Sequence, residues 1–388
     1  MDASFFIASR MRFKGRLVVI SIAISYLVML IALSVSSGFR HEIRDGLSDL
    51  CGDIQLTPQN VDPFDGLVSM NSDLSYLSEI EGMDGVDEIR PVIYRAGMVK
   101  CGENIHGVLF KGVQRVDTVA LGVSIPRRLS ELTGLKPGDR MPSYFVGGEK
   151  VRMRQFTVTS VYDAMLEADD RLVVYASLPD MQRLNSWSDN EVSGLEIMLD
   201  HSFRDEVTME DMSYMVGAVV YENSSEQDEP VYATSSVSRY RQLFDWLAII
   251  DFNVLFILVL MTIVAAFNMI SGLLIMLFEN IATIGLLKSL GMTDRSISKV
   301  FLSSSAVLVL KGMSMGNILA FVFCLIQAKT HLIGLDPENY FVSFVPVRLN
   351  PGTVLLTDAV SFAVIMVLLL LPCMFISRVD PADTVRVR

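Results

Sequence analysis

Two lipid-length apolar segments are separated by the sequence Phe278-Glu-Asn-Ile-Ala-Thr-Ile-Gly-Leu-Leu-Lys-Ser-Leu-Gly-Met-Thr-Asp-Arg-Ser-Ile297. Apolar side chains recur in its first half at helical spacing and predict a short helix. Gly291 should end this helix, because glycine tolerates the left-handed conformation that many helix ends need. Thr293 is suited to cap the next helix, with Asp294 in its first turn, where the helix dipole favours negative charge. We interpret the segment 278–299 as a coupling helix that transmits force from a soluble motor to a membrane subunit.

The composition is too apolar for an ordinary soluble protein, since 51% of the 388 residues are hydrophobic. Four segments reach the length of roughly 20 residues that crosses about 30 Å of hydrocarbon. They predict an α-helical membrane protein with four transmembrane helices and a mixed α+β extracytoplasmic domain inserted between helices 1 and 2. We expect a cytoplasmic N-terminus at 1–16, transmembrane helices at 17–37, 246–277, 300–326 and 354–376, a periplasmic domain of two subdomains at 38–245, the coupling helix at 278–299, a periplasmic loop at 327–353 and a cytoplasmic tail at 377–388.

The orientation follows from the excess of Lys and Arg in cytoplasmic segments of membrane proteins. Basic residues gather near the N-terminus, in the polar break and at the C-terminus, whereas the loop between the third and fourth segments holds two. The basic residues near the N-terminus and in the break are Arg10, Arg12, Lys14, Arg16, Lys288, Arg295 and Lys299. Both termini are therefore expected in the cytoplasm of a bacterial inner membrane protein. A retained anchor is favoured over a cleaved signal peptide, because the apolar core of the first segment is longer than 7–15 residues and no A-x-A-like site follows it.

The region between the first two membrane segments has mixed α and β patterns. Helical spacing or cap residues predict helices at 74–80, 179–184 and 205–215. Alternating apolar residues predict strands at 53–57, 88–93, 96–100, 108–113, 156–162, 171–175 and 195–199. The formal net charge of −12 is concentrated in this region, where Asp and Glu outnumber Lys and Arg by about sixteen. An acidic domain argues against nucleic acid as a partner. It would suit a basic protein partner, although acidity more often serves solubility.

Four further features concern the membrane helices and the thiols. The stripe Phe39, Ile43, Leu47 and Leu50 predicts that the first membrane helix continues as an amphipathic stalk. Gly312 and Gly316 have the spacing at which helices approach closely in lipid, although a glycine-softened helix without a fixed partner is the alternative. Lys311 lies within the same apolar run. It is either a functional group or a side chain that snorkels to the membrane interface. Cys51 and Cys101 share a compartment that permits disulfides, and the sequence leaves open whether they meet.

Motifs for catalysis are missing from the sequence. It contains no G-x-x-x-x-G-K-[ST] loop for ATP, no G-x-S-x-G nucleophile motif, and no His and Cys at metal-ligand spacing. We therefore expect a non-catalytic chain with no catalytic residue, metal or cofactor of its own.

Several motifs resemble the FtsX-like ABC transporter permeases of the MacB/FtsX superfamily, and most closely the lipoprotein-releasing LolC/LolE-type branch. The main one runs from Phe267-Asn-Met-Ile through the coupling segment to Met292. The others, in order, are Phe6-Ile-Ala-Ser-Arg10, Gly38-Phe39, Phe156-Thr-Val-Thr-Ser-Val-Tyr162 followed by Asp169-Asp170, Asn339-Tyr-Phe341 before Val345-Pro-Val347, and Ser377-Arg-Val-Asp-Pro-Ala382.

This resemblance implies a permease subunit that pairs with a second permease, identical or paralogous, and binds two copies of a cytoplasmic ATPase carrying ATP and Mg²⁺. Its substrate would be a lipoprotein, extracted from the inner membrane and passed to a periplasmic carrier. The residues expected to couple to the ATPase are Glu279, Ile284, Gly285, Lys288, Leu290 and Gly291. The chain departs from the family at Asn280, usually basic, and Thr283, usually acidic, so docking should rest on apolar contact rather than on ion pairs.

Substrate contacts are expected where the first two membrane helices leave the bilayer, next to membrane lipid. The candidates are Val35, Gly38, Phe39, Leu247 and Asp251. The alternative functions are a MacB-like efflux permease and an FtsX-like signalling or cell-division permease that moves no substrate. A membrane-anchored scaffold whose external domain only binds is a third, different class.

Overall fold

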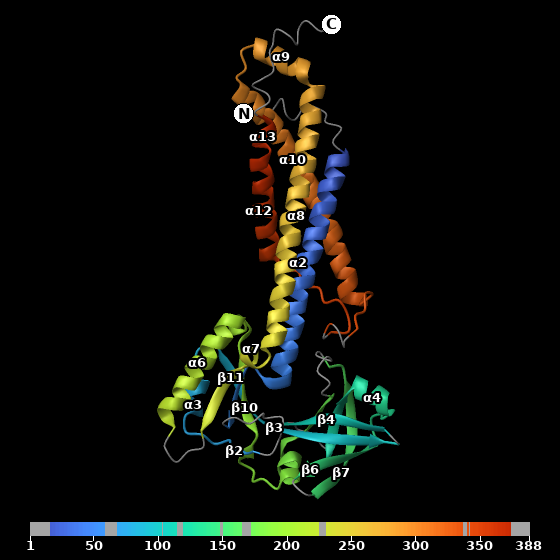
Figure 1. The fold of residues 1–388 in the computed structure, drawn as a ribbon, viewed down its shortest axis with the longest axis vertical. Coiled ribbons are helices and arrows are strands. Elements are labelled where there is room, and N and C mark those ends of the chain that lie inside the picture. Colours follow the sequence, from blue (N-terminus) through green and yellow to red (C-terminus); the bar gives the residue numbers. More distant parts are fainter. Residues whose placement is uncertain are drawn as a thin grey trace. The chain divides into compact units, whose positions relative to one another are not determined.

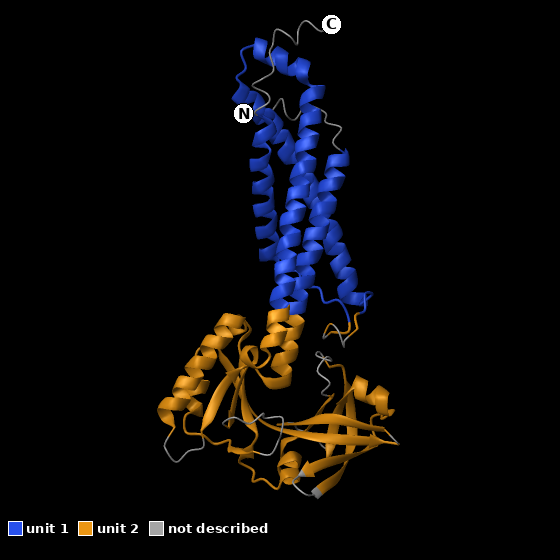
Figure 2. Cartoon of the chain, viewed as in Figure 1, with its two compact units in different colours: residues 1–40, 247–334, 344–388 blue, residues 41–246, 335–343 orange. Residues whose placement is uncertain are grey.

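The computed structural model describes residues 16–58, 68–102, 104–114, 119–147, 150–164, 172–224, 230–336, 340 and 342–373. The chain divides into two compact units (Figure 2). We call residues 1–40, 247–334 and 344–388 the membrane unit, and residues 41–246 and 335–343 the external unit. Apart from Arg16, the expected N-terminal segment 1–16 and the tail 377–388 lie outside the described residues.

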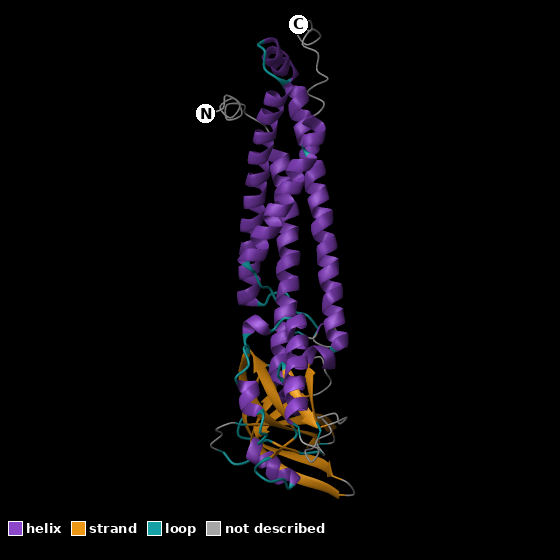
Figure 3. Ribbon diagram, turned by 90° about the vertical axis from the view of Figure 1, so that its left-hand side faces the viewer, coloured by secondary structure: helices purple, strands orange, loops and turns teal. Residues whose placement is uncertain are grey.

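Long apolar helices form the membrane unit (Figures 1 and 3). In chain order the helices are α2 (Arg16–Cys51), α8 (Arg241–Glu279), α9 (Ile281–Ser289), α10 (Asp294–Thr330), α12 (Pro351–Leu368) and α13 (Leu370–Cys373), of which α2 and α8 continue into the external unit. Among the described residues, four helical segments are long and apolar enough to cross a membrane: α2, α8, α10 and the stretch Pro351–Cys373. Large apolar side chains such as Phe256, Phe267 and Ile318 are 63–64% exposed on these helices, as expected for surfaces that meet lipid.

The helices of the membrane unit pack around one apolar core. Tyr26, Met269, Phe301 and Ile365 come from α2, α8, α10 and α12, and each is at most 1% exposed. Lipid tails are as apolar as these side chains, so association in the membrane depends on close packing rather than on burial from water.

Gly312 and Gly316 of α10 lie directly against α2. A Cβ at Gly316 would lie 2.5 Å from the carbonyl oxygen of Ala23, and one at Gly312 would lie 2.7 Å from Cγ2 of Ile22. Real Cβ atoms do not approach so closely, so the two glycines let α10 lie against the backbone of α2. The helix that they pack against therefore belongs to the same chain.

Strands dominate the external unit. They are β1 (Ile54–Pro58), β2 (Met70–Asn71), β3 (Val86–Cys101), β4 (Asn104–Val113), β5 (Gly122–Pro126), β6 (Arg140–Gly147), β7 (Lys150–Tyr162), β8 (Leu172–Ser177), β9 (Glu191–Val192), β10 (Gly194–Leu199) and β11 (Val231–Ser235). The short helices are α3 (Leu77–Glu81), α4 (Arg127–Thr133), α5 (Leu178–Asn185), α6 (Glu206–Asn223), α7 (Ser236–Arg239) and the 3-10 turn η2 (His201–Phe203). Nine strands form one sheet in the order β11-β1-β10-β3-β4-β8-β5-β7-β6.

The long strand β3 joins the two halves of this sheet. Its first part pairs with β10, its second part pairs with β4, and Met98 and Val99 also pair with β6. The pairing of β3 with β6 closes a six-stranded ring, in which the strands follow the order β3, β4, β8, β5, β7 and β6. Phe110, Phe145 and Phe156 fill the ring, with centroids 4.9–6.2 Å apart, a favourable range for aromatic pairs. The two strands predicted at 88–93 and 96–100 are thus one continuous strand, because it serves two sets of partners.

The predicted stalk is confirmed, since α2 continues without a break past Gly38 to Cys51. Ile43 and Leu47 are buried, at 0% and 1% exposure. Their i, i+4 spacing places them on one face, as the amphipathic pattern predicted.

We predict that Gly316→Leu will destabilise the membrane unit by about 1–3 kcal/mol, the usual cost of forcing atoms into a packed core. The change should lower the unfolding temperature of the purified protein in detergent. Ser314→Leu is the matched control, because Ser314 lies two residues away on the exposed face of the same helix. Equal effects of the two substitutions would contradict a special role for the Gly316 contact.

Candidate functional site

The turn between α8 and α10 has the local structure that the sequence predicted. Gly291 follows the end of α9 with φ +88°, and its amide donates to the carbonyl of Lys288 at 2.9 Å. Thr293 caps α10, with its hydroxyl accepting from the amide of Ser296 at 3.4 Å, and Asp294 lies in the first turn. The glycine stop, the cap and the first-turn acid are therefore confirmed.

The two faces of α9 differ in burial. Ile284 is 1% exposed and packs in the apolar core of the membrane unit, and Gly285 beside it is buried. On the opposite face, Leu286 and Leu290 are 56% and 75% exposed. Together with the exposed Thr283 they form a set that we call the α9 stripe: Thr283, Leu286 and Leu290. Glu279, which is also exposed, is the last residue of α8 and does not belong to this helix. Their spacing of three or four residues places them along one side of the helix. The α9 stripe can contact a partner, whereas Ile284 and Gly285 fix the helix to its own bundle.

Lys288 is engaged within the chain. Its ammonium lies 2.9 Å from a carboxylate oxygen of Asp294, and the side chain is only 10% exposed. The ion pair links the last turn of α9 to the first turn of α10. Lys288 was expected to couple to an ATPase. The structure pairs it with Asp294 of the same chain, and the coupling role stays a prediction.

Most of the expected substrate contacts are not surface groups. Phe39 and Leu247 are 7% and 2% exposed, and Gly38 is buried where a Cβ would overlap the backbone of Pro346 and Val347. Asp251 accepts hydrogen bonds from Ser36 and Arg40 and forms an ion pair with Arg40.

Val35, the remaining candidate, is partly exposed, as is Asp251. Lys311, whose role the sequence left open, lies on the exposed surface of α10. Only Val35 and Asp251 among the five candidates therefore offer surface to a substrate.

The structure does not join Cys51 and Cys101. Both are free thiols, and their sulfur atoms donate to different carbonyls: Cys51 to Leu47 at 3.3 Å, and Cys101 to Thr133 at 2.9 Å. Burial raises the pKa of the Cys51 thiol to about 12, with the nearby Glu196 carboxylate adding to the shift. A thiol in this state is unreactive at neutral pH.

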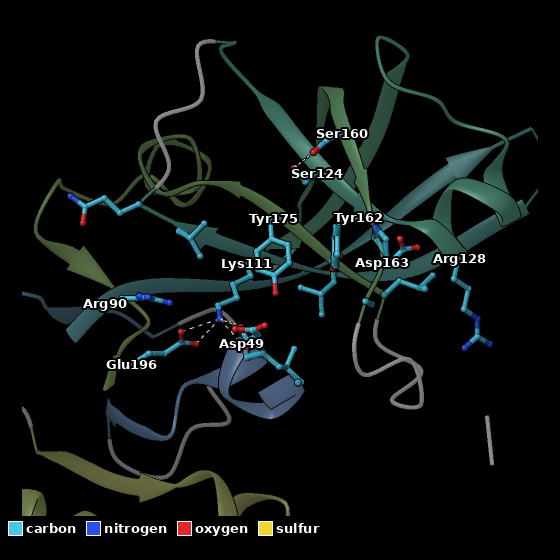
Figure 4. Close-up of a pocket in the computed structure, with 18 of the residues that line it drawn as sticks. Asp49, Arg90, Lys111, Ser124, Arg128, Ser160, Tyr162, Asp163, Tyr175 and Glu196 are labelled. Carbon is cyan, nitrogen blue, oxygen red and sulfur yellow. Dashed lines mark hydrogen bonds and ion pairs between the residues drawn. The ribbon is translucent and has the colours of Figure 1, made fainter. Parts of the chain in front are cut away.

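A cavity of about 670 Å³ in the external unit contains a buried ion pair that the sequence did not single out (Figure 4). It lies between the end of α2 and the strands, and its lining includes Asp49, Arg90, Lys111, Tyr162, Tyr175 and Glu196. Lys111 and Glu196 are each 2% exposed and form an ion pair at 2.9 Å. The available signal was a charged residue in the middle of an apolar strand pattern: Lys111 in 108–113 and Glu196 in 195–199.

A second buried polar group lies inside the membrane unit. Asp358 of α12 is 7% exposed and accepts a hydrogen bond from the amide of Asn317 in α10 at 2.6 Å. Ser361, one turn further along α12, hydrogen-bonds to the hydroxyl of Tyr26 in α2 at 2.9 Å. These contacts connect three membrane-length helices through side chains whose burial in lipid is costly unless they are paired.

The apolar helices and the large α+β unit define a multi-pass membrane protein of the permease type with an extracytoplasmic domain. Residues 255–381 match the FtsX-like permease C-terminal family. The chain therefore carries an FtsX-like permease domain, and the resemblance found in the sequence is confirmed.

Two relatives are similar along nearly the whole chain. Lipoprotein-releasing system transmembrane protein LolC of Neisseria meningitidis serogroup B is 22% identical, over 97% of this chain and 94% of its own length. Lipoprotein-releasing system transmembrane protein LolE of Haemophilus influenzae is also 22% identical, over 94% of this chain and 92% of its own length. Among solved structures, the periplasmic region of MacB from Actinobacillus actinomycetemcomitans is 9% identical with a TM-score of 0.32, and the match covers 50% of this chain and 95% of that one.

We predict that Lys288→Glu will loosen the turn between α9 and α10, because it places a second negative charge beside Asp294. A partly exposed pair of this kind contributes about 0.2–1 kcal/mol, so chymotrypsin should cleave after the exposed Leu290 up to about fivefold faster. The charge swap Lys288→Asp with Asp294→Lys should restore the slower rate. A swap that cleaves as fast as the single variant would show that the pair does not hold the turn.

Proposed function

We propose that this chain is the permease subunit of an ATP-driven transporter that extracts lipoproteins from the inner membrane and transfers them to a periplasmic carrier. The observation that carries the proposal is the similarity to LolC and LolE over nearly the full length of all three proteins. Both relatives are lipoprotein-releasing system proteins by name. The order of sequence motifs, from Phe267-Asn268 through the coupling segment, supports the same branch.

In this proposal α9 is the coupling helix and docks on a cytoplasmic ATPase, of which two copies serve a pair of permeases. The α9 stripe supports this role, since exposed leucines at the end of a membrane bundle need a partner or the headgroup layer. The positive charges of Lys288, Arg295 and Lys299 support a cytoplasmic position for this end, with both termini on the same side. The external unit, inserted between the first two membrane helices, would then face the periplasm.

Motor and permease have separate tasks in this mechanism. The ATPase supplies the energy of ATP binding and hydrolysis, and it displaces α9. Because Ile284 and Gly285 are buried in the membrane unit, a displacement of α9 moves the bundle with it. The long helices α2 and α8 continue from the bundle into the external unit and carry the motion to the lipoprotein and its carrier.

We predict that Leu286→Asp will weaken binding of the ATPase about tenfold or more, because it removes an apolar contact and buries a charge at the interface. Binding is measured by co-purification and by stimulation of ATP hydrolysis in the assembled complex. Leu286→Met is the matched control, since it keeps an apolar side chain of similar volume. The coupling role of α9 is wrong if Leu286→Asp binds and stimulates the ATPase as the control does.

Depletion of the protein should cause outer-membrane lipoproteins to accumulate in the inner membrane. The measurement is membrane fractionation followed by detection of several lipoproteins. Normal sorting combined with drug sensitivity would favour efflux, and normal sorting with a division defect would favour signalling. Either result would overturn lipoprotein release.

A further inference from the structure

A chain of buried polar side chains lies in the external unit where α2 ends and α7 precedes α8. We call it the stalk root and define it as Gln55, Tyr94, Lys111, Glu196 and Arg239. Gln55 is on β1, Tyr94 on β3, Lys111 on β4, Glu196 on β10, and Arg239 ends α7 two residues before α8 begins. Four of the five, Arg239 excepted, are at most 3% exposed.

Lys111 binds the last carbonyl groups of α2. Its ammonium donates to the carbonyl oxygens of Asp49 at 2.8 Å and Leu50 at 2.9 Å, and it pairs with Glu196 at 2.9 Å (Figure 4). The last carbonyls of a helix have no partner inside the helix. A lysine from the sheet supplies that partner here: two of its three donors reach the helix carbonyls and the third reaches Glu196.

The remaining members extend the chain to the start of α8. The Tyr94 hydroxyl donates to Glu196 and also lies 3.1 Å from the carbonyl oxygen of Leu50. Gln55 donates to the Tyr94 hydroxyl at 3.1 Å, and Arg239 donates to the amide oxygen of Gln55. Burial and the charge of Glu196 raise the pKa of Tyr94, so the hydroxyl stays neutral and remains a donor at physiological pH.

The backbone at the end of α2 is held against the same group. Gly52 follows the helix with φ +70°, and a Cβ there would lie 2.8 Å from Cβ of Glu196. The next residue, Asp53, accepts at its carbonyl from the amide of Ser236, the first residue of α7, at 2.8 Å. The end of α2 and the segment that leads into α8 are thus bonded to one another as well as to the sheet.

Stability alone is a weak explanation for this arrangement. Taking both charges of an ion pair out of water costs several kcal/mol, and apolar residues of similar size often stabilise a core equally well. What the buried charges add is a fixed geometry, because each donor has one acceptor at a defined place.

We propose that the stalk root is a mechanical junction that holds the ends of the first and second membrane helices in fixed register with the sheet. A displacement of α2 then moves the external unit as a body instead of being lost in fraying of the last helical turn. Lys111 and Glu196 are positioning residues in this role. The inference rests on the proposed function, because it assumes that motion of the membrane helices drives transport.

The test replaces the charges by neutral groups of similar size, Lys111→Met with Glu196→Gln, in the complete permease–ATPase complex reconstituted in liposomes. We expect lipoprotein released per ATP hydrolysed to fall about fivefold or more. We also expect the amides of the last turn of α2 to exchange with deuterium about tenfold faster. ATP hydrolysis and the unfolding temperature of the complex should stay near those of the parent.

Arg90→Met with Glu88→Gln is the matched control. This ion pair lines the same cavity, but its side chains are 48% and 53% exposed, so its loss should change neither readout. Tyr94→Phe is a second, milder variant that removes only the hydroxyl, and it decides the question if the double variant does not fold. It should shift both readouts in the same direction by a smaller factor.

Unchanged exchange in the last turn of α2 would overturn the junction, and so would unchanged release per ATP in a complex that does release lipoprotein. A fall in release that merely follows a lower unfolding temperature would also overturn it, because the role would then be structural. If the parent complex hydrolyses ATP but releases no lipoprotein, the proposed function fails by itself. Deuterium exchange at the end of α2 then decides the junction alone.

Discussion

Close approach of helix backbones is the constraint on which the membrane unit depends. In lipid no hydrophobic force draws one apolar helix to another, so packing requires that atoms meet at van der Waals distance along the contact. Gly312 and Gly316 allow this by bringing α10 against the backbone of α2. Gly272 of α8 also lies against α2, but there the neighbour is a side chain, since a Cβ would lie 2.6 Å from Cγ2 of Val18. The first helix is therefore held from two sides by glycine contacts, and the core around Tyr26 forms as a consequence.

The α9 turn and the end of α2 in the external unit are stabilised by different interactions. At α9, a glycine stop and the Lys288–Asp294 pair link a short helix to α10, with Ile284 buried in the bundle and Leu286 and Leu290 exposed. In the external unit, Lys111 closes α2 with charge and hydrogen bonds rather than with apolar contact. The difference follows from exposure to solvent. An exposed surface can exchange partners, whereas a buried charge without its partner is strongly destabilising.

Local chemistry accounts for what could be predicted of the fold and the site. The four membrane segments, the helix and turn at Gly291, the Thr293 cap and the stalk through Ile43 and Leu47 all follow from hydropathy, spacing or the φ preference of glycine. No alternating pattern predicted β2, β5, β6, β9 or β11, because strands with few alternating apolar residues carry little local signal. The pattern also divided β3 in two, since only its pairing with β10, β4 and β6 makes it continuous.

The sequence by itself determined the number and approximate positions of the apolar helices, the turn at α9 and the resemblance to FtsX-like permeases. These properties depend on neighbouring residues and on chain length. Only the tertiary structure decided which glycines face α2, that Lys288 pairs with Asp294, that Cys51 and Cys101 stay apart, and that Lys111 meets the end of α2. Each of these depends on groups brought together from distant parts of the chain or on how neighbouring helices are oriented. The physical reason is that burial and hydrogen-bond partners are properties of the packed molecule, which no local pattern encodes.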